Sequence, residues 1–506
     1  MLAETSLQKL NIHADVLNNM KRNYKFICFI ALFSGIFSLF SFAQEELTTF
    51  EETMQLVSVI TPEFQQFLDS DFSSYTDKEL IEAFITVGSN NGRKDELLGF
   101  YETQAEAFDE ALAEQLAPEI FEDKSYDSQY LLADTINQQM HRTFLRRYNK
   151  NSFTFADLKD TQSYDCVSAS LLYAALLTRY GIPCGAIETT DHVLTKVILD
   201  TRDVFVETTN FYGFDPGSKK EFQSNFGKST GFTYVAPGRY KLFDDLPMKK
   251  LLALVIQNDV FIKTKEKKYL EATNLAHILQ IIRDDESGNN SYTSAFGNLA
   301  SYMSRENNKK GRYEESFKWI KDLPQNQNKR ALLNNTYLAA VNEAEKADNY
   351  QIGYDALDLS LNYGVTQKNG EYIRFRLMLT NNSVVKFLDA QKFDDARKLI
   401  FSELDAGVLS KSDLLKLYRS VTVKECNLLY NQKNYKQAIE KTLDCLEYMP
   451  KDKVLVSNLK VYYLGYVDYL KTKAQPSEIK AVVAEAQKRF PNEKAFQDLT
   501  GESIPY

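Results

Sequence analysis

The chain has 506 residues, with 60 Lys and Arg against 69 Asp and Glu and a formal net charge of −9. At roughly 150 residues per domain, this length predicts about two to four domains. Hydrophobic residues at 44% and charged residues at 25% are typical of globular proteins, which argues against general disorder and against several membrane spans. The acidic balance argues against nucleic acid as a partner, because a phosphate backbone is bound by an excess of Lys and Arg.

The N-terminus has the pattern of a signal peptide. Three basic residues precede an uncharged apolar run, 26–43, which ends in the small residue Ala43 that a signal peptidase can read. We therefore predict that residues 1–43 are removed and that the protein is exported, to a periplasm or out of the cell. Met20 is then an alternative start to Met1. The other interpretation is an uncleaved membrane anchor, although the run is short for a span of about 20 residues. After cleavage we expect no membrane span.

A helical region follows the predicted signal peptide, over residues 44–125. Stretches such as DKELIEAFITVG place apolar residues three and four positions apart, as an amphipathic helix does. Another helix is expected over 128–148, and the segment NKNSFTFADLKDTQSYD after it is expected to be an ordered loop. The segment CVSASLLYAALLTRY, 166–180, predicts an apolar helix, which Gly181 and Pro183 end.

Two β-like runs come next in the chain. They are HVLTKVILD and DVFVETTN, which are rich in β-branched and aromatic residues and are separated by turn residues 200–203. This pattern predicts an antiparallel hairpin. With the helices before it, the hairpin gives a predicted α+β core over residues 126–246.

The rest of the chain is predicted to be helical, with connecting helices over 247–290 and helical repeats over 291–506. In the repeats an aromatic residue is followed three positions later by a small one, and the aromatics stand 37, 43 and 42 residues apart. The four pairs are Tyr313 with Ser316, Tyr350 with Gly353, Phe393 with Ala396 and Tyr435 with Ala438. Such a period is typical of an α-solenoid, and YKQAIEKTLDCLEYMPKD resembles the second helix of a tetratricopeptide repeat.

Cysteine and histidine are scarce, which limits the chemistry. Beyond the predicted signal peptide they are Cys166, Cys184, Cys426 and Cys445, with His141, His192 and His277. So few cysteines do not form a disulfide framework. With these three histidines and no C-x-x-C pair we expect no metal site, and no organic cofactor is indicated. Cys184, Cys426 and Cys445 are expected to be packing residues. His141 is expected at the surface or in packing, and His277 in a structural role.

Cys166, His192 and Glu207 form a candidate catalytic set. Cys166 begins the apolar helix, where unsatisfied amide groups favour the thiolate, while His192 begins the first β run and Glu207 lies in the second. An imidazole beside a thiol takes its proton, and a carboxylate on the other ring nitrogen fixes the orientation of the ring. Asp203 and Asp215 are alternative carboxylates. We favour Glu207 because of its position in the strand.

Residues 164–210 resemble the core of the transglutaminase-like superfamily, which has a papain-like fold. In that family a Cys begins an Ala- and Leu-rich helix, a Gly-Ile-Pro turn follows, a His begins a strand and an Asp lies on the next strand. The resemblance implies Cys166 as nucleophile, His192 as general base and acid, and Glu207 as the orienting carboxylate in place of Asp. The backbone amide of Cys166 and the side chain of Gln162 are candidate donors to the oxyanion.

We therefore expect an exported thiol enzyme that hydrolyses a peptide-type amide through a thioester, with a protein or peptide as substrate. A cross-linking enzyme would pass the acyl group to an amine in place of water. The alternative from another class is a non-catalytic scaffold, in which the helical repeats bind a protein partner and the transglutaminase-like core is degenerate. An inert, buried Cys166 would favour that alternative.

Overall fold

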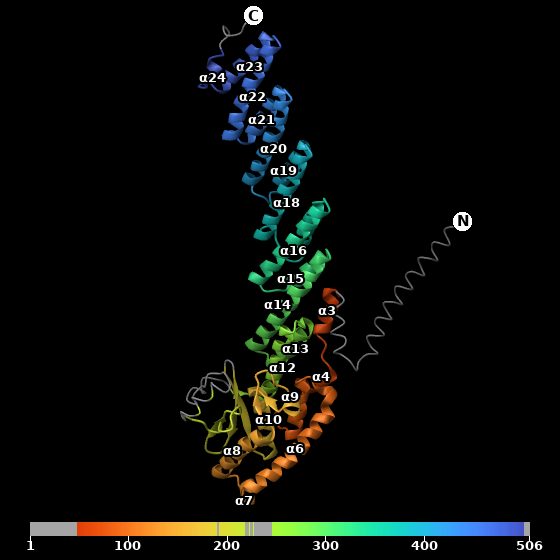
Figure 1. The fold of residues 1–506 in the computed structure, drawn as a ribbon, viewed down its shortest axis with the longest axis vertical. Helices are drawn as coiled ribbons and strands as arrows, with labels where there is room; N and C mark the ends of the chain where they lie inside the picture. Colours follow the sequence, from red (N-terminus) through yellow and green to blue (C-terminus); the bar gives the residue numbers. More distant parts are fainter. Residues whose placement is uncertain (1–47, 190–191, 218–221, 223–225, 227–244, 500–506) are drawn as a thin grey trace, which may run out of the picture. The chain divides into compact units, whose positions relative to one another are not determined.

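The structure, a computed structural model, describes residues 48–189, 192–217, 222, 226 and 245–499 (Figure 1). The predicted signal peptide, 1–43, lies outside the described residues. The chain divides into two compact units, the first reaching Met303 and the second starting at Ser304. Among the helices in the described ranges, none combines the length and the apolar character that a membrane crossing needs.

The first unit begins with helices, as the apolar periodicity predicts. They are α3 (Phe50–Val57), α4 (Pro62–Asp69), α5 (Asp77–Val87), the 3-10 turn η1 (Asn91–Arg93), α6 (Lys94–Gln115), α7 (Pro118–Glu122) and α8 (Tyr126–Thr143). Threonine side chains fix the starts of the first three helices, since Thr49, Thr61 and Thr76 each accept a hydrogen bond from a backbone N–H of the first turn. The layer buries Leu80, Phe84 and other apolar side chains in the core of this unit.

Helix α10 (Cys166–Arg179) is the central element of the first unit. Every residue from Cys166 to Leu177 is buried, and the helix packs on α5 and α8 and on strands of the sheet. Asp165 caps its N-terminus by accepting a hydrogen bond from the backbone N–H of Ser168. Gly181 ends it with a φ of +68°, a left-handed conformation that costs glycine little.

A four-stranded antiparallel sheet lies against α10 (Figure 1). The strand order is β5 (Asp203–Val206), β4 (Val193–Ile198), β3 (Cys184–Glu188) and β6 (Asp245–Leu246). Strands β4 and β5 are the predicted hairpin, and their register pairs Thr195 with Val206 and Ile198 with Asp203. This register places the segments just before β4 and just after β5 side by side.

The chain before α10 differs from the prediction at two places. Helix α8 ends at Thr143, short of the predicted 148, because the chain turns into β1 (Arg147–Tyr148), which pairs in parallel with β2 (Ser163–Tyr164). The predicted loop contains α9 (Phe155–Thr161), which starts at a capping box between Thr154 and Asp157. Both differences shape the approach of the chain to Cys166.

Three helices follow the sheet. They are α12 (Met248–Lys265), α13 (Tyr269–Arg283) and α14 (Glu286–Lys309). Helix α12 packs on α10, α5 and α13 and contacts β3, with Leu251, Leu252 and Val255 fully buried. It therefore belongs to the same core as the central helix, although it lies outside the predicted 126–246 segment.

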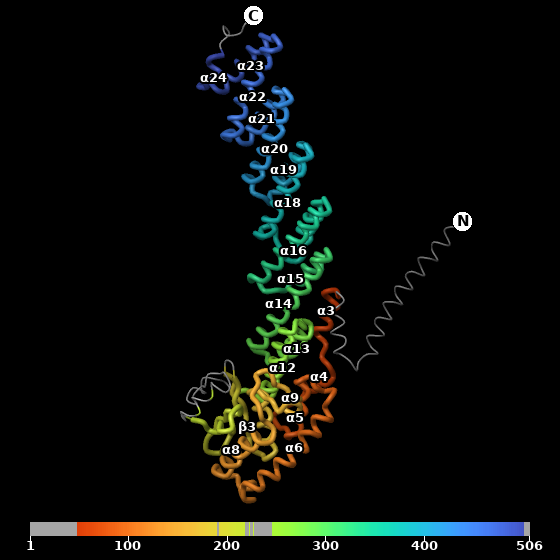
Figure 2. The backbone as a smooth tube through the Cα atoms, in the orientation of Figure 1, coloured from red at the N-terminus to blue at the C-terminus, as the bar shows by residue number. Residues whose placement is uncertain are grey.

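The second unit is all helical. Its helices are α15 (Tyr313–Lys321), α16 (Gln327–Lys346), α17 (Gln351–Leu361), α18 (Gly370–Asp389), α19 (Phe393–Ala406), α20 (Lys411–Asn431), α21 (Tyr435–Tyr448), α22 (Lys453–Thr472), α23 (Pro476–Arg489) and α24 (Lys494–Gln497). From α15 to α24 each helix packs on the next one in the chain, and α16, α18, α20 and α22 also pack in series (Figure 2). These are the contacts of stacked helical pairs.

The aromatic and small residues of the predicted repeat fall at one structural position. Each aromatic begins or caps the second helix of a pair, α15, α17, α19 or α21. The small residue lies one turn later and is buried; at Gly353 a Cβ atom would come within 2.5 Å of Leu379 Cδ2. The repeat therefore marks the closest approach between neighbouring helices.

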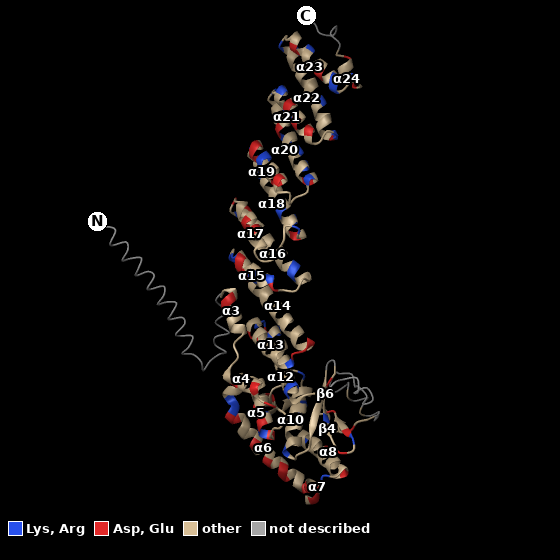
Figure 3. Ribbon diagram, turned by 180° about the vertical axis from the view of Figure 1, so that it is seen from behind, with Lys and Arg blue, Asp and Glu red and all other residues tan. Residues whose placement is uncertain are grey.

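Acidic and basic residues are interspersed along the helices of the second unit (Figure 3). Several pairs bridge neighbouring helices, since Arg376 on α18 contacts Glu403 on α19 at 2.8 Å and Arg397 on α19 contacts Glu425 on α20 at 2.5 Å. Their partly buried position makes such pairs more effective than exposed ones in fixing the register of the stack.

Candidate active site

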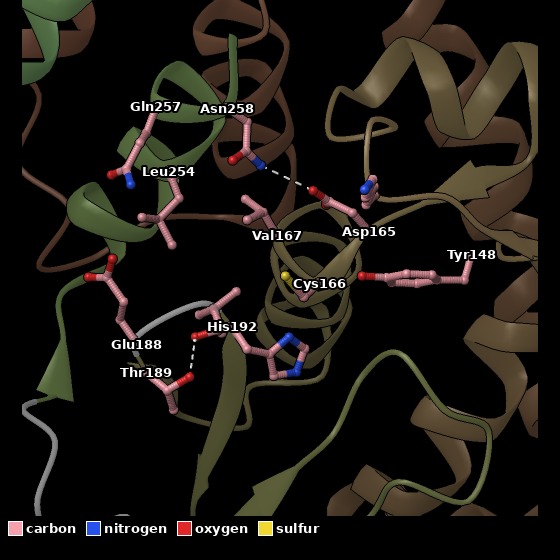
Figure 4. Close-up of a pocket in the computed structure, with 12 residues that line it drawn as sticks. Tyr148, Asp165, Cys166, Val167, Glu188, Thr189, His192, Leu254, Gln257 and Asn258 are labelled. Carbon is pink, nitrogen blue, oxygen red and sulfur yellow. Dashed lines mark hydrogen bonds between the residues drawn. The ribbon is translucent and has the colours of Figure 1, made fainter. Parts of the chain in front are cut away.

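The structure brings Cys166, His192 and Glu207 together at one end of α10. His192 Nε2 lies 2.9 Å and 2.8 Å from the two carboxylate oxygens of Glu207. The opposite edge of the imidazole is turned toward Cys166 (Figure 4). The three residues are 8%, 8% and 3% exposed, in the order Cys166, His192 and Glu207. The histidine thus lies between a thiol and a carboxylate.

Local structure explains this convergence. Cys166 is the first residue of α10, His192 directly precedes β4, and Glu207 directly follows β5. Glu207 lies one residue beyond the strand in which it was predicted. Because β4 and β5 are antiparallel neighbours, the start of one and the end of the other meet at the same edge of the sheet, and α10 begins there too.

A tight loop after β5 holds Glu207. Its backbone N–H donates to the carbonyl of Gly213 at 2.8 Å, and Thr209 Oγ1 donates to a carboxylate oxygen at 2.7 Å. A Cβ atom at residue 213 would lie 1.9 Å from the carbonyl oxygen of Glu207, so the loop requires glycine there. The carboxylate is therefore positioned by its own loop as well as by the imidazole.

The protonation states of Cys166 and His192 depend on burial and on Glu207. Burial by itself lowers the pKa of His192, but the Glu207 carboxylate and the hydrogen bonds to Cys166 and Glu207 outweigh it and raise the pKa well above 6.5. Burial raises the pKa of the Cys166 thiol, and the hydrogen bond to His192 opposes this rise. The expected thiolate-favouring effect of the helix N-terminus does not prevail, because the thiol is buried and lies beside acidic Asp165.

Asp165 has a structural position at this helix end. Its carboxylate accepts hydrogen bonds from Ser168 N at 2.9 Å, Ser168 Oγ at 3.1 Å and Asn258 Nδ2 at 3.1 Å. Burial raises its pKa to about 7. Asn258 comes from α12, so this contact joins α12 to the start of the helix that carries Cys166.

A cavity of about 240 Å³ opens over Cys166 and His192 (Figure 4). Its lining residues are Tyr148, Lys150, Asp165, Cys166, Val167, Glu188, Thr189, His192, Val193, Leu254, Gln257 and Asn258. The lining comes from β1, the start of α10, the facing ends of β3 and β4, and α12. The described residues gather no group of three or more His, Cys, Asp or Glu side chains that could hold a metal ion.

Tyr148 was missed by the sequence reasoning. It lies in the two-residue strand β1, opposite Tyr164 of β2, and its ring contacts the ring of Tyr164 edge-on at 5.8 Å. Its hydroxyl points toward Cys166 (Figure 4). Burial raises the pKa of this hydroxyl, so it keeps its proton at neutral pH and can donate a hydrogen bond. The signal in the sequence was too short to find, because a two-residue strand has no periodicity.

Gln162 does not reach the site. It ends α9 with a φ of 49°, its side chain is exposed, and it does not line the cavity. The left-handed turn directs the chain into β2 and leaves the carboxamide outside, so the proposed oxyanion role of Gln162 is not maintained. The alternative carboxylates also lie elsewhere: Asp215 pairs with Arg202 at 2.5 Å, and Asp203 lies 3.8 Å from Lys196.

The other cysteines and histidines lie away from the cavity lining. Cys426 and Cys445 are buried between repeat helices, as predicted, and Cys184 is half-buried at the start of β3. Burial raises the pKa of the Cys184 thiol to about 12. His141 packs against the Tyr164 ring, and burial lowers its pKa to about 4, so it is neutral at physiological pH. His277 contacts the Tyr292 ring.

No family model, curated protein or solved structure matches this chain. The roles proposed for Cys166, His192 and Glu207 therefore rest on the geometry of the site.

The His192–Glu207 pair is expected to make the free energy of unfolding depend on pH. The folded-state pKa of His192 lies above its unfolded value, so the imidazolium stabilises the fold fully below about pH 6.5, and this contribution is lost as pH rises through the folded pKa. We expect Glu207→Gln to remove it. The difference in free energy of unfolding between wild type and variant is then largest below about pH 6.5 and narrows at higher pH. Urea unfolding across this pH range measures it.

Asp203→Asn is the matched control, because Asp203 lies on the same hairpin but does not contact His192. A wild-type advantage over Glu207→Gln that grows with pH would contradict the prediction.

Proposed function

We propose that this protein is an exported thiol hydrolase of the transglutaminase-like type, acting on peptide amides through Cys166, His192 and Glu207. The observation that carries the proposal is the position of His192, with Glu207 on Nε2 at 2.8 Å and the Cys166 thiol on its other side, at the base of a cavity. The order of helix, sheet and triad agrees with a papain-like core over 126–246. Export rests on the signal-peptide pattern of 1–43, and repeats of the tetratricopeptide type are proposed for the second unit.

In this proposal each nitrogen of His192 has its own role. An ionised carboxylate only accepts hydrogen bonds, so Nε2, which faces Glu207, carries the proton. Nδ1 is then the atom that exchanges a proton with the thiol of Cys166. Glu207 holds the ring in this orientation and stabilises the imidazolium that is paired with the Cys166 thiolate.

The reaction proceeds in two acyl transfers. The Cys166 thiolate attacks the amide carbonyl, a C–S bond forms, and the carbonyl π electrons move to oxygen. When the C–N bond breaks, the imidazolium of His192 gives its proton to the leaving amine, and a thioester remains. Water then attacks the thioester carbonyl while His192 takes a proton from the water. The oxyanion collapses, the C–S bond breaks, and sulfur leaves as the thiolate, to which His192 returns the proton, so the products are a carboxylic acid and the free thiol.

Two groups beside Cys166 are proposed as donors to the oxyanion of the intermediate. The backbone N–H of Cys166 is at the first turn of α10, and it donates to no protein acceptor within the described part of the chain. The hydroxyl of Tyr148 approaches Cys166 from the side (Figure 4). A pair of donors at the carbonyl oxygen is what acyl transfer requires.

The test is the rate at which iodoacetamide modifies each cysteine of the folded protein, measured by peptide mass spectrometry. We expect Cys166 to react faster than Cys426 and Cys445, which serve as internal references because both are buried in the repeats. His192→Ala is expected to slow Cys166 at neutral and lower pH, since the hydrogen bond to His192 lowers the pKa of the thiol. Each pKa unit changes the thiolate fraction about tenfold at neutral pH. A rate independent of His192 would contradict the proposal.

A binding role of the second unit is the competing proposal. Large apolar side chains remain exposed on its helices: Leu338, Met378, Val385, Val454 and Val461. In a scaffold of this kind, capture of a protein partner would survive Cys166→Ala, and Cys166 would react only after unfolding. The labelling experiment therefore separates the two proposals.

A further inference from the structure

The wall of the cavity formed by α12 has its own polar groups. Leu254, Gln257 and Asn258 follow the i, i+3, i+4 spacing of one helix face, and all three line the cavity. Asn258 is occupied by Asp165, at 3.1 Å. Gln257 and Glu188 lie on the side of Cys166 opposite Tyr148 (Figure 4). The proposed reaction of Cys166, His192 and Glu207 uses neither of these two side chains.

A buried arginine orients both of them. Arg283, at the end of α13, is 6% exposed and does not line the cavity. It donates two hydrogen bonds to the Glu188 carboxylate, at 3.0 Å and 2.8 Å, and a longer one, at 3.4 Å, to Gln257 Oε1. Asp285 accepts from its Nε at 3.2 Å. A bidentate guanidinium fixes a carboxylate in one plane, so Glu188 and Gln257 are held in place before any ligand arrives.

Gln257 and Glu188 offer a ligand opposite kinds of hydrogen bond, since one can donate and the other can accept. A guanidinium only donates, so the amide oxygen of Gln257 faces Arg283, and its NH₂ group, which has no acceptor within the described residues, is available to a ligand. Each Glu188 oxygen still has a lone pair for an N–H donor. Because Arg283 neutralises the charge of Glu188, an uncharged N–H fits here better than a cation.

We propose that Gln257 and Glu188 form a subsite that binds the backbone of a peptide next to the amide that Cys166 attacks. Gln257 Nε2 donates to a peptide carbonyl, and Glu188 accepts from a peptide N–H. The peptide would then run from the oxyanion donors beside Tyr148 across Cys166 to α12. This inference rests on the proposed function, since it names the substrate class and the binding residues of the same site.

The test compares two reagents that modify Cys166. Acetyl-alanyl-alanine chloromethyl ketone carries peptide groups that reach the subsite, whereas iodoacetamide is too short. Gln257→Leu is expected to lower the ratio of the two second-order rate constants about five- to tenfold, the value of one hydrogen bond. Gln280→Leu on α13 is the matched control, because Gln280 does not line the cavity, and it is expected to leave the ratio unchanged.

Two further results would overturn the subsite. One is an unchanged ratio in Gln257→Leu, and the other is an equal slowing of both reagents, which would mean that Gln257 acts on the thiol. An analogue of the ketone with an ester in place of the internal amide lacks the N–H for Glu188. It is expected to react about fivefold more slowly with wild type, and equal rates would exclude Glu188 as the acceptor.

A binding measurement needs no reactive thiol. In Cys166→Ala, titration with acetyl-trialanine amide followed by NMR is expected to give a dissociation constant about five- to tenfold higher when Gln257→Leu is added. The same constant in both proteins, or no binding in either, overturns the subsite. Failure of the proposed function has a different signature, namely a Cys166 whose labelling rate does not depend on His192 while peptide binding still depends on Gln257.

Discussion

Cys166→Ala is expected to lower the turnover of a peptide amide by about 10⁴- to 10⁶-fold, because no other nucleophile takes the place of the thiol. The assay measures new amino groups released from a mixture of tryptic peptides incubated with wild type or variant. The side chain is small and lies at the edge of the core, so the variant is expected to keep the wild-type circular dichroism spectrum and unfolding midpoint.

Cys184→Ala is the control for this experiment. It removes a second thiol of the same unit, from the start of β3, which does not line the cavity. Its turnover is expected to remain within about twofold of wild type. If the variant at Cys166 retained turnover, or if both variants lost it equally, the assignment of Cys166 as nucleophile would be wrong.

Tyr148→Phe is expected to lower kcat by about 10²- to 10³-fold and to change KM little. The hydroxyl would donate to an oxygen whose negative charge develops in the transition state and is absent in the bound substrate, so its removal affects the chemical step and not the binding of substrate. Steady-state kinetics on one peptide amide separates the two parameters.

Tyr164→Phe is the matched control for Tyr148. The two rings are in contact, but the Tyr164 hydroxyl donates to the carbonyl of Thr209 at 3.3 Å and does not line the cavity. We expect its kcat to stay close to wild type. A raised KM with unchanged kcat in Tyr148→Phe would instead assign Tyr148 to substrate binding.

Several elements of the site could be predicted because their signals are local. The apolar run after Cys166, closed by Gly181, gives α10, and the β-branched runs give the β4–β5 hairpin. Once the hairpin is antiparallel, His192 and Glu207 must lie near each other. The structure moves Glu207 one residue past the strand, into a loop whose glycine at 213 carries no periodic signal.

One element that the sequence analysis missed had a local signal, whereas the positions of Tyr148 and Gln162 did not. The capping box of Thr154 and Asp157 was visible in the sequence, and α9 could have been predicted from it. Tyr148 could not, since its position depends on a two-residue pairing with β2. Gln162 was placed by its distance from Cys166 along the chain, but a single left-handed residue turns its side chain away.

The α12 wall of the cavity and the proposed reacting residues come from different segments of the chain. The residues proposed to make and break bonds come from 148–207, whereas Leu254, Gln257 and Asn258 come from a helix that begins after β6. Under the proposed function, substitutions at Leu254 and Gln257 change which peptide is bound while the reacting groups stay as they are. Asn258 is different, because it holds Asp165 next to Cys166. The fold therefore allows the selectivity of the site to be redesigned, or to drift, without rebuilding its chemistry.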